Sequence, residues 1–202
     1  MTFTTGLVLA AGSSSRLGRP KQLLDYRGRP LLDATLAMAR SCGFDQLLVT
    51  LGGAGDDVRV SVDLSGCQAV DNVHHSTGCS SSIVTALDHV DPRADGLILL
   101  LGDQPGVTPS TVVALMSMTE TATDAEGQPA AIAVCRYDDG RGHPFWFSRA
   151  VFDELRDLHG DKAVWKMLES GRRPVVELPV EGPVPLDVDT WDDYRRLLES
   201  AP

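Results

Sequence analysis

The sequence predicts an α/β protein in which a mostly parallel sheet carries helices on both faces. Strand-like and helix-like segments alternate from end to end, as they do where crossover helices join parallel strands. The run GLILLL (96–101) is continuously apolar after its glycine, which is typical of a central strand covered on both sides. The chain has 202 residues without a repeat or a linker-like break, so residues 1–202 are expected to form one domain.

Seven segments are predicted to be strands, and one polar stretch, TATDAEGQP (121–129), is predicted to be a surface loop. The predicted strands cover residues 6–10, 46–51, 67–70, 96–101, 130–136, 144–147 and 174–178. In a sheet of this kind ligands bind beyond the carboxyl ends of the strands. The loops that follow strands are therefore where chemistry is expected.

Helix boundaries are marked by proline, threonine and glycine. Pro30 suits the first turn of a helix through LLDATLAMAR, which Gly43 ends. Thr108 is predicted to cap a helix whose first residue is Pro109. Further helices are expected over residues 80–90, 150–158 and 162–169.

The last predicted helix begins after Thr190, which is expected to act as its N-cap with Asp193 three residues on. An apolar stripe is predicted to pack this helix onto the protein. The stripe consists of Trp191, Tyr194, Leu197 and Leu198.

Charge and cysteine content limit the classes of partner. The net charge of −10 argues against nucleic acid or an anionic membrane surface. Residues 1–30 nevertheless carry a balance of +4, which either focuses an anionic small molecule or is a solvated basic patch. The sequence shows no basic leader and no run of 18 or more apolar residues, and the spacing of its cysteines fits neither a zinc site nor a redox pair. A cytoplasmic protein with reduced thiols is expected.

The positive charge surrounds the stretch LAAGSSSRLGRPKQLL (9–24), which follows the first predicted strand. It matches neither the dinucleotide pattern G-x-G-x-x-G nor the triphosphatase pattern G-x-x-x-x-G-K-[ST]. Gly12 nevertheless allows a sharp turn that exposes backbone N–H groups, and Arg16 and Lys21 supply cations. These residues suit an anion site, although a flexible surface loop has the same composition.

The same stretch resembles the signature loop of the nucleotidyltransferases, L-A-A-G-x-S-x-R-M-G-x-x-K-x-L, with Leu17 in place of the usual methionine. The resemblance implies a three-layer, Rossmann-like (GT-A-like) fold and a loop that wraps a nucleoside triphosphate. It implies that Arg16 and Lys21 bind the triphosphate and act catalytically. The nucleotide-binding residues that it implies are Leu9, Ala10, Ala11, Gly12, Ser13, Ser14, Ser15, Arg16, Lys21, Gly78, Ser80, Ser81 and Asp103.

Three more segments carry the resemblance across most of the chain. LLLGDQPGVTP (99–109) is similar to the strand end whose aspartate, here Asp103, holds the catalytic magnesium, and STGCSSSI (76–83) is similar to a segment that borders the nucleotide. GRGHPFWFS (140–148), with LDVDTWDDY (186–194), resembles the branch that comprises the molybdenum cofactor cytidylyltransferases. That branch implies an acceptor pocket at Gly142, His143 and Pro144, although a lone histidine is usually structural.

The implied reaction is attack by an acceptor phosphate on the α-phosphate of the triphosphate, which requires charge neutralisation and positioning. Magnesium is usually held by one or two carboxylates plus phosphates. Asp187 and Asp189 alternate in an extended run and would face the same way, so either could complete the Mg²⁺ site with Asp103. As a hypothesis, Arg16 is assigned to the β- and γ-phosphates and Lys21 to the α-phosphate.

Nucleotide and acceptor follow from the resemblance alone. Relatives that use GTP carry a double glycine near Ala10-Ala11-Gly12, so the alanines favour CTP, and the acceptor is a pterin phosphate made for a molybdoenzyme. The segment GDKAVW (160–165) departs from the family pattern. Three functions compete: a molybdenum cofactor cytidylyltransferase, an enzyme that activates a sugar or alcohol phosphate, and a non-catalytic chaperone that delivers cofactor to a molybdoenzyme.

Overall fold

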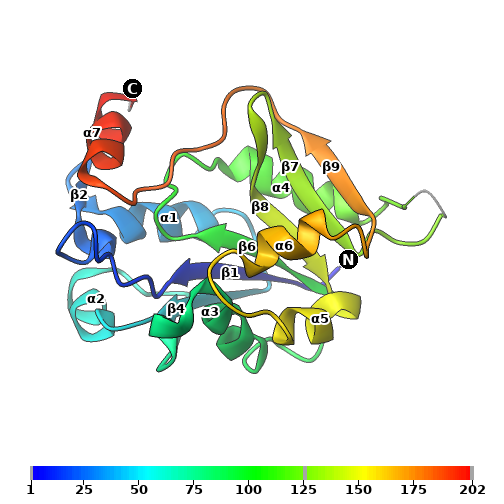
Figure 1. Cartoon of the computed structure of the whole chain (residues 1–202), viewed down its shortest axis with the longest axis horizontal. Coiled ribbons are helices and arrows are strands. Elements are labelled where there is room, and N and C mark those ends of the chain that lie inside the picture. Colours follow the sequence, from blue (N-terminus) through cyan, green and yellow to red (C-terminus); the bar gives the residue numbers. More distant parts are fainter. Residues whose placement is uncertain (1, 125–126, 201–202) are drawn as a thin grey trace.

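The computed structural model describes residues 2–124 and 127–200 and shows a seven-stranded sheet with helices on both faces (Figure 1). The strand order is β5-β4-β1-β6-β8-β7-β9. The strands are β1 (Thr4–Ala10), β4 (Gln46–Leu51), β5 (Gln68–Asp71), β6 (Gly96–Leu101), β7 (Ile132–Tyr137), β8 (Gly140–Ser148) and β9 (Val175–Pro179), and a separate hairpin pairs β2 (Asp25–Tyr26) with β3 (Arg29–Pro30). The predicted three-layer, mostly parallel architecture is confirmed.

The helices cover the sheet as the alternation of patterns requires. They are α1 (Leu31–Arg40), α2 (Gly55–Ser61), α3 (Cys79–Leu87), α4 (Pro109–Thr119), α5 (Phe152–Arg156), α6 (Ala163–Glu169) and α7 (Trp191–Ser200), with short 3₁₀ turns η1 (Lys21–Leu23), η2 (His75–Thr77) and η3 (Arg149–Val151). Among the described residues no helix is long and apolar enough to cross a membrane.

Strand β8 is the antiparallel member of the sheet and lies between β6 and β7. It follows β7 after only two residues, and a connection of that length can join only antiparallel strands. The chain runs from β1 to β4 and β5 on one side and then returns to β6 on the other side of β1. The carboxyl ends of β1 and β6 therefore form a topological switch point, where α/β proteins bind ligands.

Each central strand divides its side chains between two cores. In β1, Val8 belongs to the cluster under α1, α2 and α4, whereas Leu7 belongs to the cluster under α3, α5 and α6. In β6, Ile98 and Leu99 divide in the same way. Burial of both faces explains why these strands are apolar without a polar alternation.

A third cluster joins the two ends of the described chain, and Figure 1 shows α7 lying over β2. Its buried members are Leu17, Leu24, Leu31, Val188 and Leu197. The predicted stripe on α7 is partly wrong: Tyr194 and Leu197 pack into this cluster, but Trp191 is 39% exposed and Leu198 43%. The packed face of α7 is therefore narrower than the stripe.

Several boundaries also differ from the prediction. Pro30 lies just before α1, which starts at Leu31, and the helix expected over 80–90 ends at Leu87. The segment expected to be one helix over 150–158 divides into η3 and α5, and neither α2 nor the β2–β3 hairpin was predicted. In the predicted loop 121–129, residues Ala125 and Glu126 lie outside the described residues, and Thr123 bridges to Pro129.

Candidate active site

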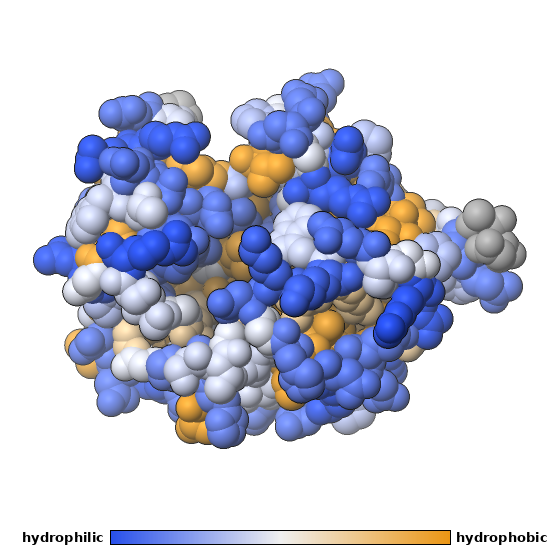
Figure 2. Space-filling model, viewed as in Figure 1, coloured by the Kyte–Doolittle hydropathy of each residue, from blue (hydrophilic) through white to orange (hydrophobic). Residues whose placement is uncertain are grey.

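The signature loop and Asp103 meet at the switch point between β1 and β6. The loop leaves β1 after Ala10, and Asp103 follows β6 by two residues. The molecular surface on this side is hollowed between the part that carries α7 and the part that carries β7, β8 and β9 (Figure 2). The two motifs predicted to act together are therefore adjacent.

Hydrogen bonds fix the loop on both sides of its turn. The Lys21 N–H donates to Ser14 Oγ at 3.0 Å, and the Leu17 N–H donates to the Ser14 carbonyl at 3.0 Å. Ser14 and Gly18 adopt positive φ angles of 52° and 69°, which let the chain reverse. Leu17, in the position where the family carries methionine, is buried in the cluster beneath α7 and anchors the loop.

Lys21 lies between two carboxylates. Its ammonium donates to Asp103 Oδ2 and, at 2.9 Å, to Asp189 Oδ1. Arg16 Nη2 donates to the other oxygen of Asp189 at 2.7 Å. Asp103 is buried, whereas the Asp189 side chain is 41% exposed. Residues predicted from three separate stretches of the sequence therefore form a single ion-pair network.

The network keeps Lys21 charged. Burial acts against the ammonium, but attraction and hydrogen bonds from Asp103 and Asp189 outweigh it, so the pKa of Lys21 is raised. Burial also acts against the Asp189 carboxylate, but Lys21 and Arg16 prevail and its pKa is lowered. Burial raises the pKa of Asp103, and the negative charge of Asp187 raises it further.

The segment that carries Asp187 and Asp189 is attached to the end of β6. Gln104 Nε2 donates to the Pro185 carbonyl at 2.9 Å. Asp187 is exposed, and Asp189 contacts Lys21 directly. Within the described residues no group of three or more histidine, cysteine, aspartate or glutamate side chains forms a ready-made metal site. Two carboxylates plus phosphate oxygens remain a donor set that suits magnesium.

The predicted capping roles are confirmed. Thr190 Oγ1 accepts from the Asp193 N–H at 3.2 Å and donates to Asp193 Oδ2 at 2.7 Å, and that same carboxylate oxygen accepts from the Thr190 N–H at 2.8 Å. Thr108 likewise accepts from the Thr111 N–H at 3.2 Å at the start of α4. The cap at Thr190 fixes the chain immediately after Asp189.

The predicted nucleotide-bordering segment lies at the start of α3. Ser80 is buried, and Ser81 Oγ donates to the Gly78 carbonyl at 2.7 Å and accepts from Asn72 Nδ2 at 2.8 Å. A Cβ atom on Gly78 would lie 2.8 Å from the Gly160 carbonyl carbon, so the absence of a side chain at Gly78 allows the two segments to approach closely. Sequence reasoning did not find Asn72, whose 2% exposure and side-chain bonds show that it organises this turn.

The unusual segment GDKAVW borders the same turn. The Cys79 N–H donates to Asp161 Oδ1 at 3.0 Å, and the Ser80 N–H donates to the Gly160 carbonyl at 3.4 Å. Burial raises the pKa of Cys79 to about 11, with Asp161 and Asp103 adding to the effect. Cys79 therefore lies within electrostatic reach of Asp103, and its raised pKa favours the neutral thiol over the thiolate.

A glycine pair that sequence reasoning also missed follows β4 at the same edge. A Cβ atom on Gly52 would lie 2.4 Å from the Ala11 carbonyl oxygen and 3.0 Å from His75 Cγ. The signal was present in the sequence, because Gly52 and Gly53 directly follow an apolar strand. Because Gly52 and Gly53 have no side chains, the ends of β1 and β4 can lie close to each other and to His75.

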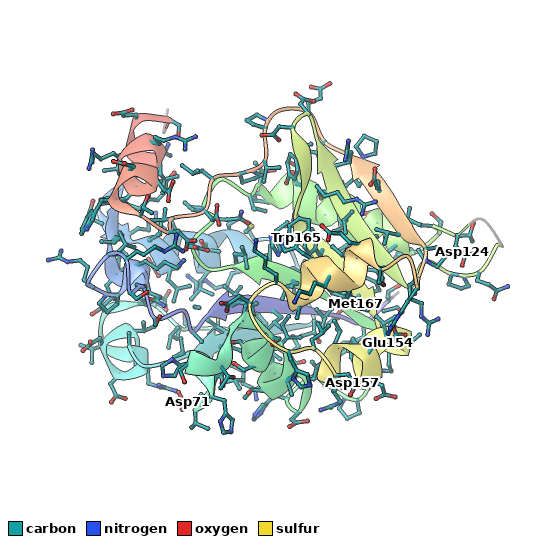
Figure 3. All side chains as sticks on the ribbon, in the orientation of Figure 1. Asp71, Asp124, Glu154, Asp157, Trp165 and Met167 are labelled. Carbon is teal, nitrogen blue, oxygen red and sulfur yellow. The ribbon has the colours of Figure 1, made fainter. Side chains whose placement is uncertain are left out.

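The predicted acceptor segment forms part of β8. Gly142, His143 and Pro144 are all buried. His143 stacks on Phe145 with ring centroids 4.1 Å apart. Trp165 lies on α6 (Figure 3), and its ring meets that of Phe145 edge-on, with centroids 5.3 Å apart. Burial lowers the pKa of His143 to about 3, so its imidazole is neutral at physiological pH.

Comparison with known proteins agrees with this geometry. A family model described as the MobA-like NTP transferase domain matches residues 6–175. The chain therefore belongs to the MobA-like NTP transferase family and is a nucleotidyltransferase with the Rossmann-like fold of that class.

Two solved structures and two curated relatives illustrate the family. The chain is 56% identical to Rv0371c from Mycobacterium tuberculosis H37Rv, with a TM-score of 0.89 over 98% of each chain. A manganese complex of the same mycobacterial protein gives 53% identity and a TM-score of 0.85, over 99% of this chain and 100% of that one. Nicotine blue oxidoreductase from Paenarthrobacter nicotinovorans is 32% identical over 69% of this chain and 68% of its own length.

The bifunctional protein GlmU from Sorangium cellulosum is 29% identical over 70% of this chain, but the match spans only 31% of GlmU. The names of these relatives do not state one shared activity. Family membership therefore fixes the class of protein, and the particular reaction has to be argued from the site.

Proposed function

We propose that this protein transfers CMP from CTP to the phosphate of the molybdenum cofactor (molybdopterin) and releases pyrophosphate. The observation that carries the proposal is the network in which Lys21 lies between Asp103 and Asp189 while Arg16 holds Asp189. Two cations and two carboxylates at a switch point suit a reaction in which one anion attacks another.

In the proposed step an acceptor phosphate oxygen forms a bond to the α-phosphorus, and the bond to the bridging oxygen breaks. Pyrophosphate leaves with that electron pair. Lys21 is assigned to the α-phosphate, because its mobile point charge can follow the developing charge, and Arg16 to the β- and γ-phosphates, because its fork matches two oxygens. Arg16 is 64% exposed on its side chain and can leave Asp189 for a phosphate.

The residues fit a divalent cation, proposed to be Mg²⁺. Asp103 is buried and its pKa is raised, and with Asp187 nearby three carboxylates face only the two cations Arg16 and Lys21, so a divalent cation would balance the charge. Asp103 would hold the ion together with Asp187 or Asp189 and phosphate oxygens. Bound there, the cation would neutralise the charge that develops on the phosphates.

The nucleotide is proposed to lie along 9–15 and against Gly78, Ser80 and Ser81. Ala10 packs in the core next to Gly102, and Ala11 is also buried, with 4% of the residue exposed, so neither methyl group is presented at the surface. One methyl group is worth about 1–3 kcal/mol of discrimination, which favours CTP only modestly.

The acceptor is proposed to bind beside 142–144 of β8. His143 is only 8% exposed and neutral, so it would form the wall of the pterin pocket and carry no charge there. Trp165 is partly exposed beside it and offers an aromatic surface to a pterin ring. We further propose a cytoplasmic location, where triphosphates are available, and delivery of the product to a molybdoenzyme.

Incubation with each nucleoside triphosphate, Mg²⁺ and the molybdenum cofactor tests the proposal through pyrophosphate release and product mass. A cofactor–CMP adduct formed from CTP is expected. Release that requires a sugar or alcohol phosphate would replace the proposed acceptor. Cofactor binding without pyrophosphate from any triphosphate would instead indicate a chaperone.

A further inference from the structure

Gln22, which follows Lys21 in η1, lies beneath the signature loop. Its side chain is buried, with 4% of the residue exposed. Its Nε2 donates to the Ala10 carbonyl at 2.6 Å and to the Gly12 carbonyl at 3.1 Å. One carboxamide therefore holds both carbonyls on either side of Ala11, at the point where the chain leaves the sheet.

These two bonds also decide where the neighbouring N–H groups point. In a planar trans peptide the C=O and the N–H point in opposite directions. Because the Gly12 carbonyl turns inward to Gln22, the N–H of Ser13, which belongs to the same peptide, turns outward. Gly12 and Ser13 are exposed, and within residues 2–124 and 127–200 the Ser13 N–H donates to no protein acceptor. An outward N–H beside Arg16 and Lys21 is an anion-binding donor.

We infer that Gln22 is a positioning residue that orients the loop N–H groups and Lys21 toward the triphosphate. The inference rests on the proposed function. Gln22 touches the loop backbone and is covalently joined to Lys21, so it acts through both and needs no contact with the nucleotide.

The test compares Gln22→Met, which keeps the size and removes the donor, with Gln46→Met. Gln46 is a matched control, because its Nε2 also donates to a backbone carbonyl, that of His89 at 2.8 Å, at the start of β4 and far from the loop. Binding of Mg·CTP is measured by calorimetry, and thermal unfolding is followed for both variants. Gln22→Met is expected to weaken binding of Mg·CTP about tenfold or more, because misaligned loop N–H groups would lose charge-assisted hydrogen bonds to the phosphates. Gln46→Met is expected to lose thermal stability and to keep the wild-type affinity.

Equal affinity of Gln22→Met and the wild type would overturn the inference and leave the proposed function standing. A loss of affinity in Gln46→Met that matches that in Gln22→Met would also overturn it, because the effect would then follow stability. If the wild type bound none of the four Mg·nucleoside triphosphates, both proposals would fall. Should Gln22→Met not fold, Gln22→Asn, whose carboxamide is one methylene shorter, carries the same comparison.

Discussion

At the scale of single residues, charge compensation decides the behaviour of the site. Lys21 is held by two carboxylates, and Asp189 is shared by two cations. Removing one charged side chain therefore leaves the charge of its partner uncompensated. The effect of a substitution is expected to depend on which charge loses its partner.

Replacement Lys21→Ala is expected to lower kcat about 100-fold or more, because a donor that stabilises the transition state is lost. The control is Lys166→Ala, since Lys166 is exposed on α6 and makes no ion pair among the described residues. Steady-state pyrophosphate release measures both variants. An unchanged kcat with a raised KM would contradict the assignment of Lys21 to the reacting phosphate.

Replacement Asp189→Asn is expected to strengthen binding of metal-free pyrophosphate several-fold, about 3- to 10-fold, because Arg16 and Lys21 lose an internal competitor. Asp192→Asn is the control, since Asp192 is 79% exposed and pairs with Arg195 on α7. Calorimetry without magnesium measures the affinity. Weaker binding by Asp189→Asn would show that the carboxylate organises the cations and does not compete for them.

The buried His143 predicts a dependence of stability on acid. Its pKa is about 3 in the folded protein, against an ordinary value of about 6.5, so the unfolded chain binds the extra proton between these values and stability falls as pH falls. From pH 7 to pH 5 this group should remove about 2 kcal/mol from the free energy of unfolding. In urea titrations, His143→Gln should lose less of its free energy of unfolding between pH 7 and pH 5 than the wild type does. The control is His89→Gln, at an exposed histidine, which should lose as much as the wild type. An identical slope in His143→Gln and the wild type would contradict the buried neutral state.

At the scale of elements, the start of α7 belongs to the site. The cap between Thr190 and Asp193 immediately follows Asp189, whereas the cap at Thr108 serves α4 and contacts no proposed site residue. Two helix caps of similar chemistry therefore have different consequences for function.

The variants Thr190→Val and Thr108→Val should each cost about 1 kcal/mol of stability, as lost caps do. Only Thr190→Val should also reduce pyrophosphate release, since it frees the chain that holds Asp189 against Lys21. Denaturant unfolding and steady-state kinetics on both proteins make the comparison. Equal activity in the two variants would show that the cap is structural alone.

The elements also show what local pattern can predict. Continuous apolar strands such as 96–101 and the Thr-Pro start of α4 were predicted correctly, because burial on two faces and the cap chemistry leave a local signature. α2 and the two-residue strands β2 and β3 were missed, since short elements depend on tertiary contacts. The stripe on α7 was predicted too wide, because periodicity does not reveal that only Tyr194 and Leu197 meet the third cluster.

For the site, motifs identified the charged residues but not their supports. Arg16, Lys21, Asp103 and Asp189 were predicted and meet in space. Gln22, Gln104 and Asn72 were missed, since a buried carboxamide that bonds to backbone carries no signal in spacing or charge.

At the scale of the whole molecule, the topology brings distant segments to one edge. Residues 1–30 carry a net charge of +4, and this part of the chain lies beside acidic groups from the end of β6 and from the segment before α7. The positive charge is therefore concentrated next to the carboxylates that would hold a metal. We propose that residues 1–202 form one domain, since the third cluster joins α7 to the signature loop.

The most direct test of nucleotidyl transfer follows separate labels on the α- and γ-phosphates of CTP in the presence of Mg²⁺ and the molybdenum cofactor. Transfer at the Lys21–Asp103 site should place the α label in the cofactor product and the γ label in pyrophosphate. Appearance of the γ label in the cofactor or in inorganic phosphate, with the α label left in CDP, would contradict the proposed reaction.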